Sequence, residues 1–112
     1  MKSHEIGQDH LRPETRAWVA SVTAEYRLED HHARLLLLAA EAWDRCVAAR
    51  EAVLLEGMVY VDRFGQPHAR PEVDIESKAR LAFARLVREL GLDLAEPDPV
   101  RPPTRQGRKG VV

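Results

Sequence analysis

Residues 33–57 read ARLLLLAAEAWDRCVAAREAVLLEG, and this stretch decides the fold of the 112-residue chain. It is dominated by Ala and Leu, two of the strongest helix formers, and it contains no glycine or proline before Gly57. We expect a helix that is capped by Asp30, runs to Glu56 and ends at a left-handed Gly57. Such a helix is about 40 Å long at 1.5 Å per residue. A helix of that length needs packing partners along its course.

The apolar surface of this helix is too wide for a single partner helix. Leucines 35–38 are consecutive and therefore point in four directions around the axis. Other helices of the same chain could cover much of this surface, but a small three-helix core also favours burial against neighbouring subunits. We therefore expect self-assembly, with Trp43 in a packed seam within or between subunits. The residues predicted for the oligomer interface are Leu36, Leu37, Trp43, Val47 and Leu54.

Two further helices and a hairpin are expected around the long helix. Apolar residues recur at helical spacing over residues 13–26, and the proline that opens this stretch is favoured in a first turn. A third helix should begin at Pro71 and stop at Gly91. Between helices 2 and 3, residues 58–61 have a short β pattern, followed by turn residues around Gly65. The fold class is therefore mainly α, with a short β-hairpin or extended turn between helices 2 and 3.

Composition divides the chain into three parts. We expect residues 1–11 to form a flexible N-terminus, residues 12–94 a single helical domain, and residues 95–112 a Pro-rich basic tail that is disordered in isolation. The first part lacks the apolar core of a signal peptide, and no run is long enough to cross a bilayer. Cys46 is the only cysteine, which excludes a disulfide framework and favours a reducing, cytosolic setting.

Motifs for chemistry are missing from the sequence. The chain has no Gly-rich phosphate loop and no nucleophile elbow. His31 and His32 are adjacent, so on a helix their side chains should diverge and cannot share a metal ion. Asp62, with Arg63 and Gly65 close by, resembles part of a phosphate-binding turn, but a turn of this composition more often simply reverses the chain. We therefore expect no enzyme activity and no catalytic, cofactor-binding or metal site.

Any binding to nucleic acid requires the charges to be segregated, because the net charge is only −1. On helix 3, Lys78, Arg85 and Arg88 cluster away from the apolar stripe. A solvated helix face has the same composition, and a single copy favours that interpretation. Repetition around an oligomer favours phosphate contacts instead, because weak contacts then add up. The tail cations support either DNA contact or docking to a protein partner, and they are Arg101, Arg105, Arg108 and Lys109.

Three segments in this order resemble the small terminase subunits of tailed phages. They are LRPETRAWVASV (11–22), the long helix (33–57) and MVYVDRFGQPHARPEVDIESKARLAFARLVRELGLD (58–93), so that the resemblance covers about residues 11–94. The matching positions of the family pattern are Gly57, Arg63 with Gly65, Pro71, Leu90, Gly91 and Leu92.

The chain also departs from the family pattern at two places. Arg70 precedes Pro71, where the family usually has Asn or His. The Thr-Pro-x-x-Arg that often follows Leu-Gly-Leu is replaced by Asp-Leu-Ala-Glu-Pro over residues 93–97.

The resemblance implies a non-catalytic ring of subunits in the host cytoplasm. This ring would recognise viral double-stranded DNA and present it to the large terminase subunit, which holds the ATPase and nuclease, for genome packaging. Residues 12–94 would then serve oligomerisation and DNA presentation. The alternative from a different class is a helical adaptor that binds another protein and never contacts DNA.

Overall fold

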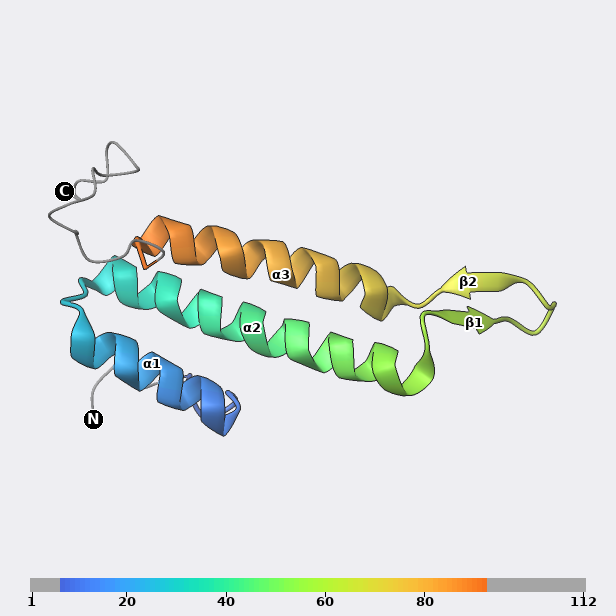
Figure 1. Cartoon of the computed structure of the whole chain (residues 1–112), viewed down its shortest axis with the longest axis horizontal. Helices are drawn as coiled ribbons and strands as arrows, with labels where there is room; N and C mark the ends of the chain where they lie inside the picture. Colours follow the sequence, from blue (N-terminus) through green and yellow to red (C-terminus); the bar gives the residue numbers. More distant parts are fainter. Residues whose placement is uncertain (1–6, 93–112) are drawn as a thin grey trace, which may run out of the picture.

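The computed structural model describes residues 7–92. Within them α2 lies in the middle, α1 and α3 run along its two sides, and a hairpin projects from one end (Figure 1). The elements in chain order are α1 (Pro13–Glu25), α2 (Asp30–Glu56), β1 (Val59–Val61), β2 (Pro67–Ala69) and α3 (Pro71–Leu90). The predicted mainly α class, with a hairpin between helices 2 and 3, is confirmed. The predicted disorder of the tail lies outside the described residues, as does the predicted flexibility of residues 1–6.

The ends of α2 follow the prediction in position but differ in chemistry. Its N-cap is Glu29 rather than Asp30. The backbone N–H of Glu29 donates to Nδ1 of His32 at 3.2 Å, and the Glu29 side chain accepts the backbone N–H of His32, which forms a capping box. At the other end Gly57 has φ 90° and ψ 175°, so it is not the predicted left-handed stop. It occupies another region of positive φ, which side chains disfavour, and leads directly into the hairpin.

The core is small and lies between α1 and the first half of α2. It consists of a cluster of buried residues against which Trp18, Leu90 and Leu92 also pack. Full burial of a leucine side chain contributes about 2 kcal/mol to the free energy of unfolding. The cluster thus joins all three helices at one end of the molecule. Its buried members are Leu11, Val19, Val22, Leu36 and Ala40.

The described residues that precede α1 pack against the rest of the domain. Leu11 is buried in the core cluster, and its backbone N–H donates to the carbonyl of Gln8 at 3.1 Å. His10 Nε2 lies 2.9 Å from Oε2 of Glu41 on α2. The described part of the segment that we expected to be flexible therefore packs on α2.

The hairpin is short and exposed. β1 and β2 are antiparallel, and Tyr60 is the register partner of His68. The turn is built by Asp62, whose Oδ1 accepts the backbone N–H groups of Phe64 at 2.8 Å and Gln66 at 2.9 Å. All strand residues are exposed, so nothing in residues 7–92 covers either face of the hairpin.

The end of α3 follows the sequence prediction. Gly91 adopts the left-handed conformation with φ 79° and ψ 12°. Its N–H donates to the carbonyl of Arg88 at 3.0 Å, and that of Leu92 donates to the carbonyl of Val87 at 3.1 Å, a pattern that closes a helix and reverses the chain. None of the three helices of residues 7–92 has the length and apolar character required to cross a membrane.

Candidate interaction surfaces

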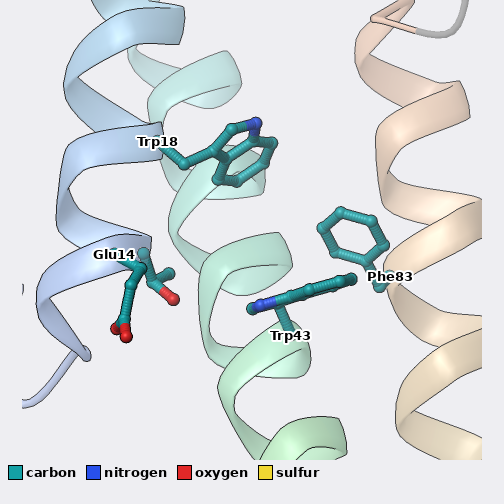
Figure 2. A pocket seen from close by; sticks show the side chains of 5 residues that line it. Glu14, Trp18, Trp43 and Phe83 are labelled. Carbon is teal, nitrogen blue, oxygen red and sulfur yellow. The ribbon is translucent and has the colours of Figure 1, made fainter.

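An aromatic cavity opens between α1 and α3 over the middle of α2 (Figure 2). Trp18, Trp43 and Phe83 contribute one ring from each helix, while Glu14 and Thr15 form its edge on α1. The ring centroid of Phe83 lies 5.1 Å from that of Trp43 and 5.8 Å from that of Trp18, in tilted arrangements that aromatic pairs favour. The volume is about 300 Å³, at the lower end for binding sites. Trp43 is 41% exposed, so residues 7–92 do not enclose it in the packed seam that we expected, and a seam between subunits stays a prediction.

Hydrogen bonds fix the α1 edge of this cavity on α2. The backbone N–H of Arg12 donates to Oδ2 of Asp44 at 2.8 Å, and the hydroxyl of Thr15 donates to its Oδ1 at 2.5 Å. The guanidinium of Arg12 also donates two bonds of 3.1 Å to Glu51. This side-chain hydrogen bonding is the main reason why the pKa of Glu51 is lowered. The position of α1, and hence of the cavity edge, is set by specific polar contacts.

A second polar contact joins α2 and α3. Oε2 of Glu76 on α3 accepts hydrogen bonds from Nε of Arg50 at 3.3 Å and from Nη2 of Arg80 at 2.5 Å. The hydrogen bond from Arg50 is the largest cause of the lowered pKa of Glu76. Arg80 is therefore engaged within the chain and is not part of the outward basic surface.

The basic face of α3 consists of Lys78, Arg85 and Arg88. All three side chains are exposed, whereas the side of the helix that packs on α2 contains buried Ala79 and half-buried Phe83. Nζ of Lys78 lies 3.0 Å from a carboxylate oxygen of Asp74. Within residues 7–92, Arg85 and Arg88 form no ion pair. The structure thus brings the three predicted cations to one outward face.

The other predicted DNA contacts are the tail cations, and they lie outside the described residues. They are Arg101, Arg105, Arg108 and Lys109.

The apolar end is an exposed surface at the far end of the molecule from the core. Leu54 and Leu55 are 79% and 81% exposed at the end of α2, and Phe64 at the hairpin tip is 74% exposed. Met58 and Val61 add exposed apolar side chains between them. Of these residues, sequence reasoning named only Leu54 as an interface residue. The others were missed because apolar residues near a helix end and in a strand normally indicate an internal core.

The predicted interface residues occupy different environments. Leu36 is only 2% exposed and belongs to the core of its own chain, so it has almost no surface left for a neighbouring subunit. Leu37 and Val47 are half-buried. Trp43 and Leu54 are exposed and lie further along α2 than the residues of the core cluster. Only these last two present a large apolar surface to a partner.

The hairpin contains a small polar cluster that holds its shape. Nε2 of His68 lies 2.8 Å from Oδ2 of Asp62, and the His68 ring stacks on Tyr60 with centroids 5.3 Å apart. The guanidinium of Arg70 lies 5.7 Å from the centre of the Tyr60 ring. The pKa of Asp62 is lowered, chiefly by the hydrogen bond from the backbone N–H of Gln66. Asp62 is thus engaged in reversing the chain, as its sequence context indicates.

The histidines at the start of α2 differ from the prediction. The rings of His31 and His32 do not diverge but are in contact, with centroids 4.1 Å apart. Nδ1 of His32 accepts a hydrogen bond from the backbone N–H of Glu29, the N-cap of α2. In the part of the chain that the structure describes, no group of three or more His, Cys, Asp and Glu side chains is placed to hold a metal ion.

The fold and these surfaces define a small, mainly helical protein in which an aromatic cavity, a basic face and an apolar end are open to partners. The chain belongs to the phage terminase small subunit family, because the family model described as "Phage terminase, small subunit" matches residues 16–105. No curated protein and no solved structure matches the chain.

Proposed function

We propose that this chain is a non-catalytic terminase small subunit that assembles into a homo-oligomeric ring in the host cytoplasm. The ring recognises viral double-stranded DNA and presents it to the large terminase subunit for genome packaging. Family membership over residues 16–105 supports the general role. The observation that carries the finer proposal is the separation of two exposed surfaces, the apolar end at the hairpin and the basic face on α3.

The apolar end supports self-assembly. Several large apolar side chains exposed at one end of a small protein favour a partner there, and an isolated two-stranded hairpin is at best marginally stable in water. Leu54, Leu55 and Phe64 are each exposed by more than 70%. A second copy of the chain that covers them would bury this surface and support the hairpin.

The basic face supports contact with the phosphate backbone. Arg85 and Arg88 form no ion pair within residues 7–92, so binding to phosphate does not require an ion pair inside this part of the chain to break first. One copy offers few contacts. A ring repeats them, and each neutralised phosphate releases counterions, so the affinity grows with the number of copies.

Light scattering coupled to size exclusion tests the assembly step. A discrete mass several times that of the 12.7 kDa chain supports the ring. A stable monomer at micromolar concentration contradicts it.

The salt dependence of DNA binding tests the second step. Arg85→Ala with Arg88→Ala should weaken binding to duplex DNA and flatten the plot of log affinity against log salt by about 0.9 for each phosphate that is no longer neutralised. Arg34→Ala with Arg45→Ala removes the same charge from α2 and serves as the matched control. If both double variants changed DNA affinity and its salt dependence equally, the basic face would not be the DNA contact that we propose. An oligomer that does not bind DNA would favour the helical adaptor instead.

A further inference from the structure

We propose that the aromatic cavity is a docking site for this chain's own C-terminal segment, residues 97–105, with the sequence PDPVRPPTR. The proposal is independent of the assigned role in packaging. It rests on the chemistry of the cavity, on where the last described residues after α3 pack, and on the composition and length of the segment that follows.

The cavity has the features of a site for proline and arginine side chains. Its walls are Trp18, Trp43 and Phe83, and a carboxylate, Glu14, stands at its α1 edge (Figure 2). Proline-rich segments dock in aromatic-lined grooves, because their extended conformation is preformed and loses little entropy on binding. Guanidinium groups stack on tryptophan faces. A volume of about 300 Å³ suits a few side chains rather than a large ligand.

The charges around the cavity also fit a basic segment. Glu14 is exposed at the edge. The neighbouring cation, Arg12, is already held by two hydrogen bonds to Glu51. A cation that enters the cavity therefore meets the Glu14 carboxylate and the aromatic faces. Arg101 and Arg105 lie among the prolines of the segment and supply that cation.

The last described residues after α3 pack close to the elements that form this cavity. Gly91 reverses the backbone, and Leu90 and Leu92 pack against the core cluster that Trp18 also contacts. Up to Leu92 the chain therefore lies on the side of α3 that faces α1 and α2. From Phe83 to Leu90 the helix rises about 10 Å, while residues 93–97 span up to about 17 Å when extended. The segment that begins at Pro97 can thus reach the cavity.

Fluorescence of the full chain gives a direct test, because Trp18 and Trp43 are the only tryptophans in the sequence and both line the cavity. The test variant combines Arg101→Ser, Arg105→Ser, Pro102→Ala and Pro103→Ala. A segment that binds with a millimolar Kd as a free peptide is about half docked when tethered. The acrylamide quenching constant should therefore rise about twofold, with emission shifted to longer wavelength.

A matched pair of variants isolates the contribution of the arginines. Arg101→Ser with Arg105→Ser should raise quenching, whereas Arg108→Ser with Lys109→Ser removes the same charge beyond the segment and should leave quenching unchanged. Equal quenching in wild type and the fourfold variant, at equal helix content by circular dichroism, would overturn the proposal. A protection of the tryptophans that disappears on dilution would also overturn it, because the segment would then come from another copy.

Discussion

At the scale of single residues, Asp44 on α2 holds the start of α1 in place. It accepts the hydroxyl of Thr15 and the backbone N–H of Arg12. Both donors lie at the start of α1, which has no side-chain cap of its own. A carboxylate on α2 thus does for α1 what a capping residue normally does.

Replacement of Asp44 should therefore destabilise the protein more than replacement of an exposed partner in the same network. Asp44→Ala leaves two donors without an acceptor in a partly buried place, and we expect a loss of about 2 kcal/mol in the free energy of unfolding. Glu51→Ala removes only the exposed pair with Arg12, which water screens, and should change stability far less. Urea denaturation monitored by circular dichroism measures both. Equal losses would contradict the anchoring role of Asp44.

The lowered pKa of Glu76 predicts how the stability of the fold changes with pH. Its pKa is lowered from the ordinary 4.5, first by the hydrogen bond from Arg50. A carboxyl with a depressed folded-state pKa stabilises the fold at pH values above its unfolded pKa, and this contribution is lost as the pH falls through the folded-state pKa. Stability should thus decline below about pH 4.5. Glu76→Gln should be less stable than wild type at pH 7 and should lose less on acidification, as followed by thermal unfolding at each pH. A parallel pH dependence in both proteins would rule this out.

At the scale of elements, α2 and α3 pack through small side chains. Ala39, Ala42, Cys46 and Ala49 are buried at helical spacing on α2, and Ala79 is the buried residue of α3. Small residues allow two helices to approach closely, but they leave no free volume for a larger side chain. The contact between α2 and α3 is long and lined largely by alanines. It explains why these two helices remain packed against each other well beyond the core cluster.

A larger side chain in this contact should force the helices apart. Ala79→Leu is expected to cost about 2 kcal/mol through overpacking. Ala84→Leu makes the same change at an exposed position of α3 and should be nearly neutral. The comparison of their urea midpoints checks the packing. Tolerance of leucine at residue 79 would contradict a close α2–α3 contact.

At the scale of the whole molecule, the core cluster and the apolar end lie at opposite ends of α2. The core cluster joins the three helices at one end, and the hairpin projects from the other (Figure 1). Nothing in residues 7–92 covers Leu54 or Phe64. The arrangement leaves the apolar end available to a second copy, as the proposed assembly requires.

Charged residues at the apolar end should therefore reduce assembly without unfolding the chain. Leu54→Asp with Phe64→Asp is expected to lower the mass measured by light scattering towards that of one chain, because burial of unpaired carboxylates is unfavourable. Leu81→Asp alters another exposed leucine, on α3, and should leave the mass unchanged. Circular dichroism verifies that helix content is retained. An unaltered mass in the double variant would place the interface elsewhere.

Much of the fold could be predicted from local sequence, whereas the candidate surfaces could be predicted only in part. Pro71 and Gly91 bound α3 as expected, because helix ends depend on backbone preferences of single residues. The basic face was also predictable, since helical spacing alone places Lys78, Arg85 and Arg88 together. The aromatic cavity was not. Its rings come from three helices, and no periodicity reports how separate helices are placed.

The sequence by itself determined where the helices and the hairpin lie, because propensity, capping and turn chemistry act within a few residues. Only the tertiary structure decided which apolar residues are covered. Leu36 and Leu54 are about five turns apart on α2 and so lie on the same face of the helix. Nevertheless Leu36 is 2% and Leu54 79% exposed. The reason is length: α1 has 13 residues against 27 in α2, so it covers only the first part of that face.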